Sequence, residues 1–163
     1  MAQTISRMEF LRGDFRGERG VLRPPWACAE EEFIDRCTAC GACISACGEH
    51  ILVRGRAGFP TIDFRLGACS FCEACVRSCK TGALRIEPSS PWRYKADFGD
   101  RCLAVTHRVV CQSCGDYCDS HAVRFIPTLR GVPSPTLEAE LCTGCGACVA
   151  VCPAAAVRVG IGG

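Results

Sequence analysis

Cysteines recur at one fixed spacing along this chain. Of its 17 cysteines, sixteen fall into four groups of four. Three groups follow the pattern C-x2-C-x2-C-x3-C: Cys37, Cys40, Cys43 and Cys47; Cys69, Cys72, Cys75 and Cys79; and Cys142, Cys145, Cys148 and Cys152. Thiolates at this spacing hold [4Fe–4S] clusters in bacterial ferredoxins. These twelve cysteines therefore predict three clusters, with iron as the bound metal.

The remaining group is irregular. It consists of Cys102, Cys111, Cys114 and Cys118. Shifting the first group by 71 residues places three of its cysteines on the last three of this group, but Cys37 falls on Arg108. The nearest upstream cysteine, Cys102, could reach the same position through a longer loop, which predicts a fourth [4Fe–4S] cluster. A three-iron cluster, a fourth ligand other than cysteine, and no cluster at this group remain as alternatives. Cys28 belongs to no group and is interpreted as a spare thiol.

The fourth cysteine of each group is expected to serve a different cluster from the first three. In two-cluster ferredoxins this cysteine ligates the neighbouring cluster. The groups would then exchange their fourth cysteines in pairs, first with second and third with fourth. The predicted sets are Cys37, Cys40, Cys43 with Cys79; Cys69, Cys72, Cys75 with Cys47; Cys142, Cys145, Cys148 with Cys118; and Cys102, Cys111, Cys114 with Cys152.

An internal repeat predicts the fold. Between the cysteine groups of each half, short β-rich runs flank a glycine-bearing turn, at residues 51–64 and again at 123–137, and such runs indicate hairpins. The expected class is α+β, with two tandem bicluster ferredoxin-like units that are small and nucleated by their clusters. Short helices are expected at residues 30–36 and after the fourth cysteine of each group. The expected boundaries are an N-terminal arm at 1–29, units at 30–87 and 99–163, and a linker at 88–98.

Several other classes fit the sequence less well. Structural zinc prefers two separated cysteine pairs, and a disulfide framework needs an oxidising compartment. The net charge of +2 gives no electrostatic case for nucleic acid. No nucleophile–base arrangement, phosphate loop or small-molecule pocket is readable, so the chain is not expected to be an enzyme. The sequence contains no run of 18 apolar residues, so no membrane span is expected. No secretory signal is visible, which favours the cytoplasm.

Four features together resemble the NapF family, ferredoxin-type accessory proteins of the periplasmic nitrate reductase system. They are the residues at 22–26, those at 69–75, the broken third group, and those at 125–129. The resemblance covers residues 6–159, whereas one cysteine run alone would indicate only a ferredoxin.

The resemblance implies a cytoplasmic protein that meets the precursor of the nitrate reductase catalytic subunit before export. Such a protein would assist assembly or loading of a [4Fe–4S] cluster, and the basic arm with residues 22–26 would be a docking element. The alternatives are a general electron-transfer ferredoxin relay and a structural zinc protein.

Overall fold

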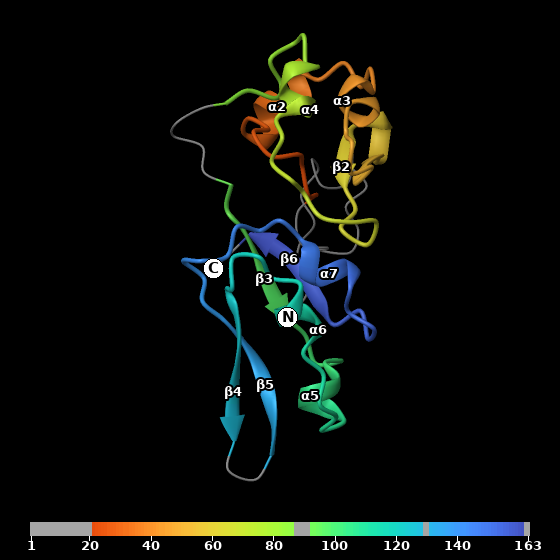
Figure 1. Cartoon of the computed structure of the whole chain (residues 1–163). Coiled ribbons are helices and arrows are strands. Elements are labelled where there is room, and N and C mark those ends of the chain that lie inside the picture. The colour runs from red at the N-terminus through yellow and green to blue at the C-terminus, as the bar shows by residue number, and fades with distance from the viewer. Residues whose placement is uncertain (1–20, 87–91, 129–130, 162–163) are drawn as a thin grey trace, which may run out of the picture.

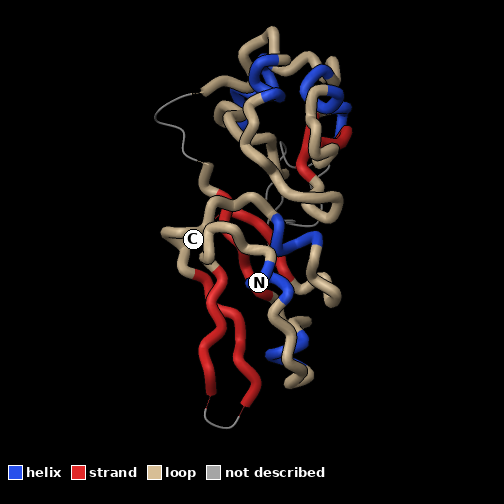
Figure 2. Tube along the Cα trace, viewed as in Figure 1, coloured by secondary structure: helices blue, strands red, loops and turns tan. Residues whose placement is uncertain are grey.

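The computed structural model describes residues 21–86, 92–128 and 131–161. Short helices and strands are joined by long loops, and they gather into a first region, at 21–86, and a second region, at 92–161 (Figures 1 and 2). The first region contains α2 (Glu30–Arg36), α3 (Ala42–Ser45), β1 (Leu52–Arg54), the 3-10 helix η1 (Arg56–Gly58), β2 (Pro60–Ile62) and α4 (Ala74–Arg77). The second contains β3 (Tyr94–Phe98), α5 (Leu103–Thr106), α6 (Ser113–Asp116), β4 (Val123–Thr128), β5 (Gly131–Leu137), α7 (Ala147–Ala150) and β6 (Val157–Ile161). The chain is thus a small mixed helix and strand protein.

The strands form antiparallel pairs. β1 pairs with β2 and β4 pairs with β5, with Leu52 opposite Ile62 and Val123 opposite Leu137. Both pairs are hairpins at the places where the repeat predicts them. A third pair joins β3 to β6 and places Tyr94 opposite Ile161, so it ties the start of the second region to its end.

The short helices lie one cysteine earlier than predicted. α2 occupies the predicted residues, but α3, α4, α6 and α7 each contain the third cysteine of a group, and a turn follows each fourth cysteine. Before three of these helices stands a residue with left-handed backbone: Gly41, Glu73 and Gly146, each directly after the second cysteine. That reversal lets the helix begin at once, so the prediction of helices after the fourth cysteine is wrong.

The segment just before α2 is part of the first region and not a free arm. Pro24, Pro25 and Arg23 are buried, and the amide of Ile62 donates to the carbonyl of Leu22 at 2.8 Å. Residues 1–20 of the predicted arm lie outside the described residues. Residues 22–28 of the predicted arm therefore pack with the first region, while the boundaries of the units stay a prediction.

Arg23 shows how firmly this segment is held. Its guanidinium pairs with Glu30 at 2.7 and 2.9 Å and donates to the carbonyl of Pro60 at 3.0 Å. It also stacks over the rings of Phe33 and Phe59, at 4.7 and 5.5 Å from their centroids. These contacts are internal and hold Arg23 within the first region, and docking by residues 22–26 stays a prediction.

The predicted linker extends too far. Residues 87–91 lie outside the described residues, but residues 94–98 are strand β3. Tyr94, Ala96 and Phe98 alternate with Lys95 and Asp97, the period of a half-buried strand, and Ala96 is buried. Residues 94–98 of the predicted linker are therefore a strand of the second region.

Each region has its own buried core. The first is built around Phe33, Ile51, Leu52, Ile62 and Phe64. The second consists of Ala96, Cys114, Val123, Cys148 and Val157, so small side chains and cysteines make most of it. In the parts of the chain that the structure describes, no helix is both long enough and apolar enough to cross a membrane.

Candidate iron–sulfur cluster sites

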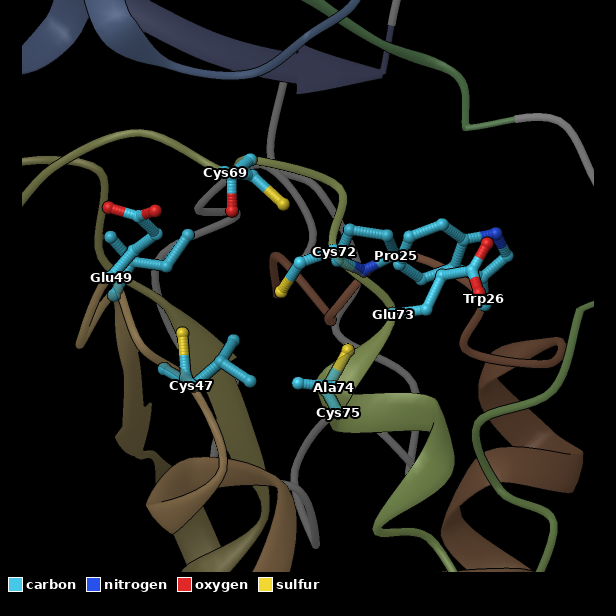
Figure 3. Close-up of a pocket in the computed structure, with 12 residues that line it drawn as sticks. Pro25, Trp26, Cys47, Glu49, Cys69, Cys72, Glu73, Ala74 and Cys75 are labelled. Atoms are coloured by element: carbon cyan, nitrogen blue, oxygen red, sulfur yellow. The ribbon is translucent and has the colours of Figure 1, made fainter.

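Four cysteines of the first region line one cavity. The loop and helix of the second group bring Cys69, Cys72 and Cys75 around a space of about 350 Å³, counting its open mouth, and Cys47 of the first group closes it. The four sulfur atoms point into this common space (Figure 3). We call this set site 2; it unites the members that the predicted exchange of fourth cysteines requires.

A matching cavity lies in the second region. Cys142, Cys145 and Cys148 line a space of about 320 Å³ together with Cys118, the fourth cysteine of the other group. Small residues fill the gaps between the thiols, among them Gly144, Gly146 and Ala147. We call this set site 3. Sites 2 and 3 have the same composition, three cysteines of one group and the fourth of another, because the cysteine spacing repeats along the chain.

Site 1 comprises Cys37, Cys40, Cys43 and Cys79. The pKa of Cys43 is raised to about 11, mainly by burial, and the negative charges of the Cys37 and Cys79 thiolates contribute to that value. Three of the four predicted members therefore lie near one another. The fourth predicted member, Cys40, is exposed.

Site 4 comprises Cys102, Cys111, Cys114 and Cys152. The pKa of Cys114 is raised to about 11, by burial first and then by the charges of Cys102, Cys152 and Cys111 in that order. Cys102 thus lies beside the others, although the sequence spacing is irregular. It stands directly before α5, while Arg108, at the position where the repeat predicts a ligand, is exposed.

The third cysteine of each group is the most protected from ionisation. Burial is the largest cause, and it raises the pKa of Cys75 to about 11 and that of Cys148 to about 12. These thiols sit on the short helices that line the sites. A bound cluster would take them as thiolates, so cluster loading must remove their protons.

Backbone amides and hydroxyls point at several other sulfurs. The amide of Phe71 donates to Sγ of Cys69 at 3.4 Å, that of Leu84 to Cys79 at 3.4 Å, and that of Ala156 to Cys152 at 3.2 Å. Burial opposes ionisation of Cys79, but the Leu84 amide and the Thr81 hydroxyl and amide outweigh it and lower its pKa. Such donors stabilise thiolates and tune cluster potentials.

The sequence reasoning missed the hydroxyls that accompany the fourth cysteines. Thr81 Oγ1 lies 3.6 Å from Cys79 Sγ, and Ser120 Oγ lies 3.6 Å from Cys118 Sγ. The signal was available, because both hydroxyl residues stand two positions after the fourth cysteine. Cys28 belongs to none of the four sets and is buried in the first core.

The chemistry of these sets fits iron–sulfur clusters. Within the described residues, no three His, Cys, Asp or Glu side chains converge closely enough for a single metal ion. Zinc would draw its sulfurs to about 2.3 Å from one centre. A four-iron cube instead takes one thiolate at each of its corners, which spreads the sulfurs apart.

Comparisons with known proteins agree with this chemistry. The model of the 4Fe-4S dicluster domain family matches residues 36–90 and 107–156. Ferredoxin-type protein NapF of Escherichia coli strain K12 is 41% identical over 152 residues, which cover 93% of this chain and 92% of the relative. NapF of Haemophilus influenzae is 39% identical over 167 residues, with 96% and 94% covered. Methylamine utilization ferredoxin-type protein MauM of Methylorubrum extorquens is 32% identical over 181 residues, with 94% and 81% covered. The resemblance predicted from the sequence is confirmed, and the chain belongs to the NapF family of ferredoxin-type iron–sulfur proteins.

Proposed function

We propose that this protein assists maturation of the periplasmic nitrate reductase in the cytoplasm. It would bind the precursor of the catalytic subunit before export and support assembly or loading of that subunit's [4Fe–4S] cluster. The observation that carries the proposal is the identity of 41% with NapF over 93% of the chain. The four cysteine sets support the cofactor that such a role requires, namely a [4Fe–4S] cluster in each set.

The exposure of cysteines at two sites supports a role in transferring clusters to a partner. Cys40 of site 1 and Cys72 of site 2 are exposed, and the cavity of site 2 has an open mouth. A cluster bound there would be reachable by incoming thiolates of a partner. The same exposure would also allow electron transfer, so a general ferredoxin relay is the second candidate.

Cluster transfer separates the two candidates. Loaded protein is mixed anaerobically with the apo catalytic subunit, the two are separated, and iron is measured in each. A maturation protein should lose about four irons for each cluster that the subunit gains. A Cys28→Ala variant, which keeps all four sites, is the matched control. Absence of transfer, together with fast reduction of the mature reductase, would favour the relay.

Precursor docking is tested by removing residues 1–20, which lie outside the described residues. Deleting residues 1–20 leaves the packed residues 22–28 in place, whereas deletion to residue 26 would remove Arg23 from its contacts with Glu30. If the basic arm docks the precursor, the shortened protein should keep its iron but lose the precursor in a pull-down. Unchanged capture would refute docking by the arm and leave cluster transfer to be judged separately.

A further inference from the structure

The two regions meet through the loops that carry their cluster ligands. The amide of Cys69 donates a hydrogen bond to the carbonyl of Cys145 at 2.8 Å. Cys69 belongs to site 2 and Cys145 to site 3. The side chains also interact: burial is the main cause of the raised pKa of Cys69, and Cys145 is among the charged neighbours that contribute. Two prospective ligands of different clusters are therefore joined by one hydrogen bond.

Glycines make this close approach possible. A Cβ at Gly146 would overlap the ring of Phe64, which belongs to the core of the first region. A Cβ at Gly144 would overlap the carbonyl of Tyr94 and the indole of Trp92. Both glycines also have a positive φ, of +83° and +74°. The loop of site 3 can lie against Phe64 of the first region only because Gly146 carries no side chain, whereas Gly144 makes room for Trp92 and Tyr94 of its own region.

Aromatic side chains cover the junction. Phe71, between Cys69 and Cys72, packs edge-on against Trp26 and Trp92 at centroid distances of 6.3 and 6.1 Å, and Trp92 packs on Tyr94 at 4.5 Å. Trp92, Val149 and Val159 contact the first core from the second region. Figure 1 shows α7 and β6 on the side of the second region that faces the first. Side chains of both regions thus meet at the junction.

Within each region, the sites are neighbours as well. Cys43 of site 1 contributes to the raised pKa of Cys75 of site 2, and Cys114 of site 4 contributes to that of Cys148 of site 3. In both cases burial is the larger cause. The helices that carry these thiols contact each other in pairs, α3 with α4 and α6 with α7. The neighbours therefore run in one order: site 1, site 2, site 3, site 4.

We propose that the contact between Cys69 and Cys145 passes electrons between the two regions, so that all four sites form one series. This rests on the proposed binding of clusters at these sites. Cys69 and Cys145 would hold clusters on either side of the junction, and bound clusters would supply one-electron chemistry, in which the reduced one is oxidised and its oxidised neighbour reduced, with no bond made or broken and no proton moved. The first electron comes from an external one-electron donor such as dithionite. The junction is a property of this chain that neither cluster transfer nor precursor binding requires.

The test isolates the two clusters on either side of the junction. The double variant Cys40→Ser, Cys102→Ser removes one ligand from site 1 and one from site 4, and iron and sulfide analysis shows which clusters remain. After reduction with dithionite, electron paramagnetic resonance should show spin coupling between sites 2 and 3. Two clusters that remain bound and give independent signals would overturn the path without affecting the cluster assignment. Wild-type protein that contains no clusters would refute the assignment of clusters to these four sites.

Glycine variants on the same background test the geometry. Gly146→Ala should weaken the coupling, because the new methyl group displaces Phe64, and iron and sulfide analysis of this variant shows whether both clusters remain. Gly160→Ala is the matched control, since a Cβ there meets nothing within 4 Å. Adding Phe64→Ala to Gly146→Ala should restore part of the coupling. Coupling that survives Gly146→Ala undiminished would contradict the role of this contact. If that variant loses iron, the coupling measured in the Cys40→Ser, Cys102→Ser protein without the glycine change still tests the proposal.

Discussion

Cys102 is the residue on which the count of clusters depends. The repeat predicts a ligand at position 108, where Arg108 stands exposed with a φ of 51°. The structure instead brings Cys102 beside Cys114, with helix α5 occupying the longer interval between the first two cysteines of the group. An irregular spacing in the sequence is thus compatible with a complete set of thiols in space.

Replacing Cys102 should remove one cluster. Cys102→Ser protein, purified anaerobically, is expected to hold about four irons and four sulfides fewer than wild type, because a cube without its fourth thiolate is poorly held. Cys28→Ala removes a thiol that lies outside all four sets and should change neither count. Equal iron in wild type and Cys102→Ser would instead favour a three-iron cluster, a different fourth ligand or no cluster at site 4.

Single residues also show where sequence reasoning reached its limit. The composition of the sites could be proposed from the spacing, because each cysteine group is local and the exchange of fourth cysteines follows a general rule. The contact of Phe64 with Gly146 could not, because nothing near either residue indicates the other. Gly146 lines site 3 and also makes room for Phe64 of the other region.

At the scale of elements, the four short helices have one function in common. Each of α3, α4, α6 and α7 holds the third cysteine of its group in a buried position or a partly buried one. The sequence predicted α2 and the two hairpins correctly, since these depend on local patterns. It misplaced the four-residue helices because left-handed backbone at a residue such as Glu73 leaves no clear signal in the sequence.

Cluster loading should depend on pH through these helix thiols. Burial raises the pKa of Cys43, Cys75 and Cys114 to about 11 and that of Cys148 to about 12, so all four are protonated in the empty protein at neutral pH. A cluster binds the thiolate, so loading releases protons and becomes more favourable as pH rises toward these values. Reconstitution with iron and sulfide at pH 7 and pH 9 should give tighter loading at pH 9.

Proton release can be measured directly. In weakly buffered solution with an indicator dye, loading should release about one proton or more per cluster from its helix thiol. Cys28→Ala protein is expected to release as many protons as wild type. Loading that releases none and is independent of pH would contradict the buried, protonated state of these thiols.

At the scale of the whole molecule, the two regions differ in how much they depend on clusters. The first core contains large side chains such as Phe33, Ile51 and Phe64, and Arg23 ties the preceding segment to it. The second core has Cys114 and Cys148 among its five buried members. Removing clusters therefore takes away more of the packing in the second region.

Chelation of iron should unfold the second region first. Amide hydrogen exchange during anaerobic chelation is expected to lose protection in β3 and β6 while α2, β1 and β2 still keep theirs, because small domains that rely on bound metal have little other core. The intact protein kept without chelator is the control. Simultaneous loss of protection in both regions would show that they fold as one cooperative unit.

Anaerobic iron and acid-labile sulfide analysis of the wild-type protein tests the central claim, that four crossed sets of cysteines each hold a [4Fe–4S] cluster. Four complete cubes predict about sixteen irons and about sixteen sulfides per chain. Bound zinc without sulfide would contradict the claim.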